Sequence, residues 1–196
     1  MGSSFGEAAL LIISKLGGIY LAAVMLRFLL QAARADFYNP VCQAIVKITS
    51  PLVNPLRRVI PGWRRLDIAT LILALVLNTL ATYGMVLLTG QQLQVGMAVS
   101  WAFVGLIAFT LDLYFYAMVV LVVASFIAPF SGHPVLLLIF QLLQPFYKLA
   151  QRIIPPMGGL DFTPLLLMLA IQVIEILVLN PLASGLRVVP AFVIGL

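Results

Sequence analysis

The chain has 196 residues, of which 63% are hydrophobic and only 9% are charged, and its formal net charge is +5. So few polar side chains cannot cover a soluble domain of this size, and the mean hydropathy of +1.17 predicts a membrane protein. A single cysteine, Cys42, excludes an internal disulfide, and a single histidine, His133, leaves no Cys/His cluster for zinc or iron. We therefore expect no metal and no other cofactor.

Four apolar runs are long enough to cross about 30 Å of hydrocarbon, which takes roughly 20 helical residues. We predict spans at about 8–33, 68–89, 109–129 and 162–180. The first residues lack the basic segment of a cleavable signal, so the first run is expected to remain as a span. The apolar run at 95–130 is too long for one upright helix. We predict that it breaks near Asp112 and that 95–108, which contains Trp101, forms a separate interfacial helix, because tryptophan prefers that depth.

The sequence matches itself at an offset of 94 residues. Between positions 40 and 75, 12 of 36 residues are identical to those 94 positions later, and the matches include prolines, an arginine and an aspartate: Pro40 with Pro134, Pro51 with Pro145, Arg58 with Arg152 and Asp67 with Asp161. Apolar bias cannot produce such matches, so we predict a tandem duplication. The predicted fold is an all-α membrane protein of two two-span repeats, at 1–94 and 95–196.

Basic residues indicate the orientation. The two long connections, between the first and second spans and between the third and fourth, contain 8 of the 11 lysines and arginines. By the positive-inside rule, both connections are cytoplasmic and both termini lie on the other side of the membrane. The two repeats are therefore expected to run in the same direction, unlike the inverted repeats of many transporters.

Both connections are predicted to contain helical segments. Val41, Ala44, Ile45 and Ile48 recur at helical spacing, and a second apolar face follows after Pro51 interrupts the pattern. Short amphipathic helices with arginines on the polar face lie among lipid headgroups. The corresponding stretch of the second repeat, 135–144, is apolar nearly all round and is expected to be buried against the spans. The residues expected to bind anionic lipid or a protein partner are Arg57, Arg58, Arg64, Arg65, Lys148 and Arg152.

Ionisable residues inside spans are functional candidates, because each is costly to insert into a bilayer. Lys15 and Glu175 lie at matching depths in the first and last spans, and we predict that they form an ion pair. Such a pair could fix the fold or relay protons or ions; alternatively, each side chain snorkels alone. Asn78 and Gln172 match at the 94-residue offset and are expected to form hydrogen bonds between helices.

Asp67 and Asp161 each begin a span and are expected to cap its first turn. Alternatively, one of them pairs with Arg27 in the first span, whose counterpart in the second repeat is Leu121. His133 precedes a proline and is interpreted as a residue that ends a helix rather than as a metal or haem ligand.

The sequence contains no Walker loop, no dinucleotide-binding turn and no hydrolase or metalloprotease motif, so an enzyme is not expected. The arginine cluster around Arg58 is typical of a topology and lipid signal beside a membrane, and we expect no nucleic-acid partner.

Four stretches resemble the YggT family of small bacterial inner-membrane proteins, whose plastid relatives include the YlmG proteins. They are MLRFLLQ around Arg27, DFYNP at 36–40, SPLVNPLRRVIP at 50–61 and RIIPPMGGLDFTP at 152–164. The resemblance extends over both repeats and implies a non-enzymatic factor with no catalytic residues. It links plastid members to cytochrome complex maturation and nucleoid distribution, and bacterial members to cell-division loci, osmotic stress and potassium homeostasis.

The sequence thus favours a non-enzymatic inner-membrane factor for membrane-protein complex assembly or membrane organisation. Its expected partners are the bilayer, in particular anionic phospholipid, and a membrane protein. Two alternatives remain open: a small ion channel or transporter, and a structural subunit of a larger membrane complex.

Overall fold

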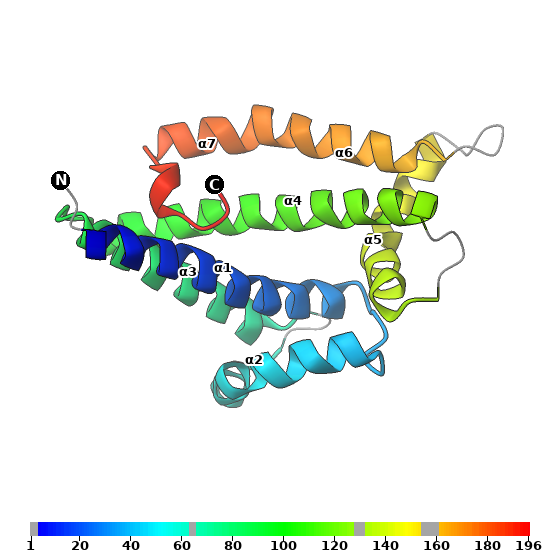
Figure 1. Cartoon of the computed structure of the whole chain (residues 1–196), viewed down its shortest axis with the longest axis horizontal. Coiled ribbons are helices and arrows are strands. Elements are labelled where there is room, and N and C mark those ends of the chain that lie inside the picture. Colours follow the sequence, from blue (N-terminus) through cyan, green and yellow to red (C-terminus); the bar gives the residue numbers. More distant parts are fainter. Residues whose placement is uncertain (1–3, 63–65, 128–131, 154–160) are drawn as a thin grey trace.

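The computed structural model describes residues 4–62, 66–127, 132–153 and 161–196, and its regular structure over these residues is entirely helical (Figure 1). The helices are α1 (Ser4–Ala32), α2 (Pro40–Val59), α3 (Ile68–Leu88), α4 (Val95–Ile127), α5 (Pro134–Ile153), α6 (Thr163–Ile174) and α7 (Asn180–Gly185). A π-helical turn, Glu175–Leu179, joins α6 to α7, and a 3-10 turn, Pro190–Phe192, lies near the C-terminus. Four helical segments are long and apolar enough to cross a membrane: α1, α3, α4 and the continuous run from α6 to α7.

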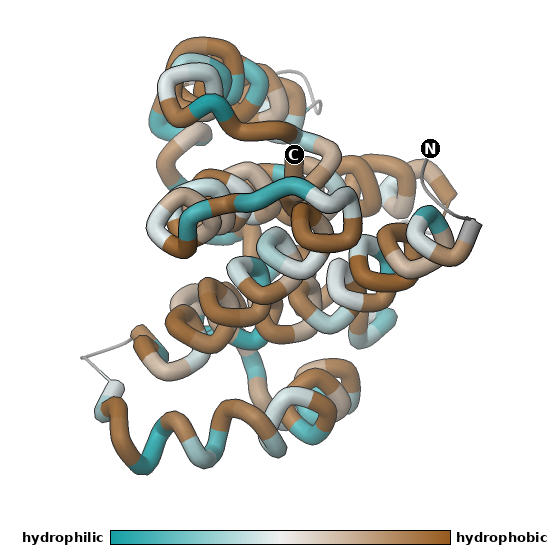
Figure 2. The backbone as a smooth tube through the Cα atoms, turned by 90° about the vertical axis from the view of Figure 1, so that its left-hand side faces the viewer, coloured by the Kyte–Doolittle hydropathy of each residue, from teal (hydrophilic) through white to brown (hydrophobic). Residues whose placement is uncertain are grey.

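The four long segments lie side by side along the long axis of the molecule (Figure 1). α1 and α4 run in one direction, and α3 and the α6–α7 run return in the other. α2 joins α1 to α3, and α5 joins α4 to α6, near the end at which α1 and α4 stop. Figure 2 shows hydrophobic residues over most of each long helix, whereas α2, the lowest helix in that view, alternates hydrophobic and hydrophilic residues.

The predicted break between 95–108 and a span at 109–129 is wrong, because α4 is one helix of 33 residues. The run contains no proline, and its one charged side chain, that of Asp112, leaves the backbone hydrogen bonds of the helix intact. Trp101 is buried in the bundle, and its indole donates to the carbonyl of Leu186 (3.0 Å). A helix of this length measures about 50 Å, so it must tilt or extend beyond the hydrocarbon.

Pro51 was expected to separate two short helices, but α2 continues through both Pro51 and Pro55. The hydroxyl of Ser50 donates to the Val46 carbonyl (2.6 Å), and that of Thr49 donates to the Ile45 carbonyl (2.7 Å). These bonds reinforce the turn before the proline, although the carbonyl that loses its backbone donor to Pro51 is that of Lys47, four residues earlier.

The expectation that 135–144 is buried against the spans holds for one face only. Leu138, Leu142 and Leu143 are buried, whereas Leu137 and Phe140 are exposed. A single helix that packs on one side buries only one stripe of its surface.

The last segment does not stop at 180 but continues past Pro181 to Gly185. Proline lacks an amide hydrogen and usually ends a helix, but the π-helical turn before it changes the hydrogen-bonding register, since the amide of Asn180 donates to the Glu175 carbonyl. The chain beyond α7 then folds back, and the buried side chains of Val193 and Ile194 pack against α1, α3 and α4. Gly105 permits this approach, because a Cβ atom there would lie 2.3 Å from Cγ1 of Val193.

Two apolar clusters hold the helices together. One joins α1, α3 and the C-terminal segment around Leu21, Val24 and Leu73. The other joins α1, α4 and α5 around Leu30, Met118 and Leu142. Both are built from residues at helical spacing, so they orient α2 and α5 against the ends of the long helices.

Candidate functional site

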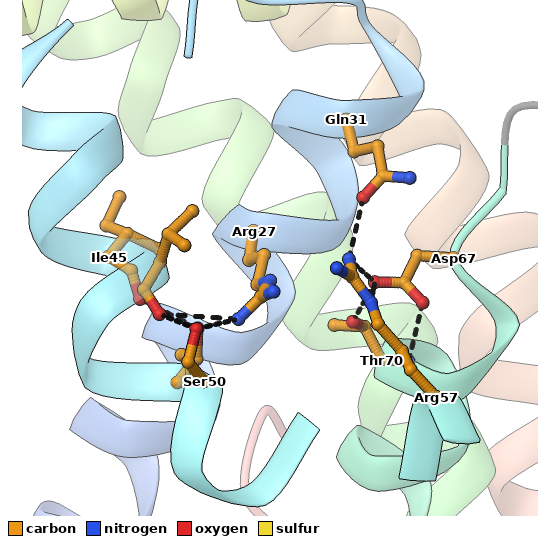
Figure 3. A network of polar contacts seen from close by, with 9 residues as sticks. Arg27, Gln31, Ile45, Ser50, Arg57, Asp67 and Thr70 are labelled. Atoms are coloured by element: carbon orange, nitrogen blue, oxygen red, sulfur yellow. Dashed lines mark hydrogen bonds and ion pairs between the residues drawn. The ribbon is translucent and has the colours of Figure 1, made fainter. Parts of the chain in front are cut away.

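Polar side chains from α1, α2 and α3 gather where these three helices meet (Figure 3). Arg27 lies in α1 five residues before the helix ends at Ala32, and Asp67 directly precedes α3. The cluster therefore lies at the ends of two apolar helices, beside the amphipathic α2.

Arg27 is buried, with an exposed fraction of 3%. Its Nη1 donates to Oγ1 of Thr49 (2.8 Å), to Oγ of Ser50 (3.3 Å) and to the carbonyl of Val46 (3.3 Å). All three acceptors are neutral groups of α2. Over the described part of the chain no carboxylate lies within 4.0 Å of Arg27, so no ion pair balances its charge.

Asp67 is equally buried, and its carboxylate pairs with Arg57. The alternative expectation, that an aspartate pairs with Arg27, is therefore wrong for Asp67. Nε of Arg57 donates to Oδ2 of Asp67 (3.0 Å), and its Nη2 donates to the same oxygen and to Oε1 of Gln31 (3.2 Å). The hydroxyl and the amide of Thr70 also donate to Asp67, whose side chain thereby caps α3. Arg57 is thus engaged in an internal pair, although 39% of its side chain remains exposed.

Burial raises the pKa of the Asp67 carboxyl, but the hydrogen bonds from Arg57 and Thr70, together with the positive charge of Arg57, outweigh it. The net pKa lies below its ordinary value, so Asp67 is a stable anion at neutral pH. It neutralises Arg57 and leaves Arg27 as the uncompensated charge of the cluster.

A cavity of about 550 Å³ opens beside this cluster. Its walls include both arginines and the aspartate, and the lining residues are Arg27, Gln31, Phe37, Val46, Arg57, Gly62 and Asp67. Two cations and one anion give the walls a net charge of +1, which favours an anionic ligand.

The remaining predicted basic residues lie on the outer surfaces of α2 and α5. Arg58, Lys148 and Arg152 are exposed, and none forms an ion pair within the described ranges. Arg64 and Arg65 lie outside the described residues. The two helices are linked at their beginnings, because Nδ2 of Asn39 donates to the Pro134 carbonyl and the Asp36 amide donates to Oε1 of Gln141 (both 2.8 Å).

The structure does not bring Lys15 and Glu175 together, so the predicted ion pair is wrong. Among the described residues the only ion pair is Arg57–Asp67, and α4 lies between α1 and the last helical run (Figure 1). Lys15 is exposed, and the charged group that interacts with Glu175 is Asp112 of α4. Matching depth in the bilayer does not fix which helices are neighbours.

Asn78 and Gln172 also differ from one another. Asn78 is fully buried, and its Nδ2 donates to the carbonyls of Ala102 (3.0 Å) and Ile194 (3.4 Å), so it links α3 to α4 and the C-terminal segment. Gln172 is exposed on the surface of α6. Lys15, Asn78, Gln172 and Glu175 therefore lie in separate places and do not line one path.

Asp161 accepts a hydrogen bond from the amide of Thr163 (2.9 Å) at the start of α6, one residue before the N-cap position. Nδ1 of His133 accepts from the amide of Val135 at the start of α5 (3.3 Å). Cys42 is buried, and burial is the main cause that raises the pKa of its thiol. In the described residues no three histidine, cysteine or acidic side chains gather to hold a metal ion.

The helical architecture and its four long apolar segments define a multi-pass membrane protein. The chain belongs to the CCB3/YggT family, whose sequence model matches residues 6–88 and again residues 100–182. It is 38% identical over 179 residues to an uncharacterized protein of Pseudomonas aeruginosa, with 90% of this chain and 91% of the relative aligned. The uncharacterized protein YggT of Escherichia coli K12 is 32% identical over 176 residues, with 88% and 90% aligned. No solved structure gives a significant match.

Sequence reasoning proposed a role for Arg27 and a cap for Asp67 but missed the pairing of Asp67 with Arg57. The two residues are ten positions apart in the sequence with Pro61 between them, and no helical period connects them. The available signal was the burial of a carboxylate at the start of an apolar helix, which requires a nearby cation or several donors.

Proposed function

We propose that the protein is a non-enzymatic organising or assembly factor of the bacterial inner membrane, and that α2 and α5 together form a basic surface on its cytoplasmic side. We call this surface, defined by Arg58, Lys148 and Arg152, the basic platform. It binds anionic phospholipid or an acidic segment of a membrane-protein partner.

A tandem duplication would produce such a platform from two copies of one helix. α2 spans 40–59 and α5 spans 134–153, so both ends differ by 94 residues. The two ranges matched by the family, 6–88 and 100–182, differ by the same 94 residues. The parallel course of α1 and α4 supports two copies with the same orientation, which would place α2 and α5 on one face of the membrane (Figure 1).

The observation that carries the proposal is the direct contact between the two amphipathic helices, through Asn39 and Pro134 and through Asp36 and Gln141. The junction fixes how the two cationic helices are oriented, while Arg58, Lys148 and Arg152 lie toward the other ends of these helices, where they are free to bind negative ligands. Anionic headgroups contribute about 1 kcal/mol for each lysine or arginine near the surface.

The test is co-purification with the full chain. The triple variant Arg58→Gln/Lys148→Gln/Arg152→Gln and the wild type are extracted in the same mild detergent, and the bound phospholipids and proteins are quantified by mass spectrometry. The triple variant is expected to lose anionic lipid, a protein partner, or both. Lys15→Gln is the matched control, because Lys15 is also exposed but lies in the first half of α1 and belongs to neither helix of the platform.

Unchanged lipid and unchanged protein partners in the triple variant would refute the platform. A loss of equal size in Lys15→Gln would also refute it, since the effect would then follow net charge rather than position.

A further inference from the structure

The cavity between α1, α2 and α3 is distinct from the basic platform, because none of Arg58, Lys148 and Arg152 lines it. We propose that this cavity is a binding site for a phosphate group, held by Arg27 and supplied by the headgroup of a membrane phospholipid. The inference does not depend on the platform, and it concerns a different face of α2.

The first argument is the state of Arg27. A guanidinium carries five N–H donors, and within the described chain only the Nη1 of Arg27 has hydrogen-bond partners. Its Nε and Nη2 are not among the fully enclosed polar atoms that lack a partner. Since Arg27 lines the cavity, these donors are open to a ligand there.

The second argument is charge. Removing an arginine from water without a counter-ion is unfavourable, and the one carboxylate of the cavity is already held by Arg57 and Thr70. An anion that accepts two hydrogen bonds from the free edge of Arg27 would neutralise the remaining charge of +1. Phosphate oxygens suit the planar fork of arginine for this purpose.

The third argument is place. Arg27 is five residues, or about 8 Å, from the end of α1, and Asp67 stands just before α3. Such positions lie near the level of lipid headgroups when the apolar helices span a bilayer. Phe37 and Val46 also line the cavity and add apolar residues beside the arginines, which suits the acyl part of a phospholipid whose phosphate is bound by Arg27.

The fourth argument comes from the other half of the chain. At the 94-residue offset, Arg27 and Thr49 correspond to Leu121 and Leu143, both of which belong to an apolar cluster. The same helical arrangement therefore forms there with leucines in place of the buried arginine and its partner. Arg27 is retained in the first half for a reason other than the fold.

The experiment uses the delipidated full chain in mild detergent, with ligand binding followed by native mass spectrometry and by the melting temperature. Four probes are added: dioleoyl-phosphatidylglycerol, dioleoyl-phosphatidylcholine, dioleoylglycerol, which lacks phosphate, and inorganic phosphate. The wild type is expected to retain one phosphatidylglycerol and to release dioleoylglycerol. Arg27→Gln is expected to weaken retention by at least about tenfold, which corresponds to the loss of charge-assisted hydrogen bonds.

Gln31→Glu is a second variant, chosen because it should weaken binding in the cavity without destabilising the fold. A glutamate at this position still accepts from Arg57 but adds a negative charge to the cavity wall. It should keep the melting temperature of the lipid-free protein and weaken phosphatidylglycerol retention by about tenfold or more. Lys47→Gln is the matched control, since it removes an exposed charge of α2 that belongs neither to the cavity lining nor to the basic platform, and it should leave retention unchanged.

The probes also identify the source of the phosphate. Retention of either phospholipid with no effect of inorganic phosphate supports a lipid headgroup. Protection by inorganic phosphate that depends on Arg27 would assign the site to a soluble phosphate compound and overturn the lipid assignment. Equal retention in the wild type, Arg27→Gln and Gln31→Glu, or equal retention of dioleoylglycerol, would overturn the site altogether. All retention measurements are repeated in the Arg58→Gln/Lys148→Gln/Arg152→Gln background, so that lipid bound at the basic platform does not contribute to the result.

Discussion

The two halves of the molecule use the same order of helices but stabilise the junction of those helices differently. In the first half, Arg27 of α1 bonds to Thr49 of α2, and Arg57 of α2 bonds to Asp67 before α3. At the 94-residue offset, Arg27 and Thr49 are replaced by Leu121 and Leu143, and Arg57 by Gln151. Asp161 keeps the carboxylate, but it is exposed, and from the described residues it accepts only the local amide hydrogen bond of Thr163.

The space between the helices differs in the same way. The first half has a polar cavity beside its arginines, whereas α4, α5 and α6 enclose an apolar cavity of about 310 Å³ lined by residues such as Tyr114, Met118 and Phe146. The comparison teaches that this fold does not require a buried arginine. The polar network of the first half is therefore not needed for the junction to form, which is consistent with the phosphate site proposed for it.

The largest effect on stability is expected from Arg57→Gln. The change leaves the buried Asp67 carboxylate without its cation, and because Arg57 is itself partly exposed we expect a loss of about 2 kcal/mol in the free energy of unfolding, below the range for a fully buried pair. Unfolding in mixed detergent micelles measures it. Arg58→Gln should change stability by less than about 0.5 kcal/mol. Equal losses in the two variants would show that the Asp67 pair contributes nothing of its own.

A double-mutant cycle converts the first half toward the second. Arg27→Leu alone should lower the free energy of unfolding by about 1–2 kcal/mol, because the acceptors on α2 lose their donor. Adding Thr49→Leu should recover part of that loss, since the pair then matches Leu121 and Leu143. Losses that simply add would contradict the correspondence between the two junctions.

The Asp67 pair also predicts a dependence on pH. The pKa of Asp67 is lower in the folded protein than in the unfolded chain, so its contribution is present above the unfolded value of about 3.9 and is lost as pH falls through the folded value. The stability difference between the wild type and Asp67→Asn should therefore be constant from pH 7 to about 5 and should shrink below about pH 4. A difference that persists unchanged at pH 3 would contradict the ion pair.

The smallest effect is expected from Asp161→Ala. This change removes the acceptor for the Thr163 amide at the start of α6, and the loss of such a cap lowers the free energy of unfolding by about 0.5–1 kcal/mol. The same unfolding measurement applies. A loss as large as that of Arg57→Gln would mean that the two aspartates have equivalent environments, against the comparison of the halves.

Hydropathy was sufficient to predict the number and approximate limits of the long helices, because a long apolar run can be identified in the sequence without knowing which other helices it packs against. It failed for α4, where a long run without proline continued as one helix past Asp112, and for α2, where the helix continued through Pro51 and the hydroxyls of Thr49 and Ser50 bonded to carbonyls of the preceding turn. The pair expected between Lys15 and Glu175 failed because depth along a span does not determine which helices are neighbours. The folding back of the C-terminal segment onto Gly105 depends on contacts between residues far apart in the sequence, and no local pattern indicates it.

The central claim is that α2 and α5 lie on one face of the membrane. It is tested most directly by labelling single cysteines at 58, at 152 and, as a control for the opposite face, at 91, each in a Cys42→Ala background, with a membrane-impermeant maleimide. In spheroplasts only the cysteine at 91 should react, and in inverted inner-membrane vesicles only those at 58 and 152. Reaction of 58 and 152 from opposite sides would contradict the account.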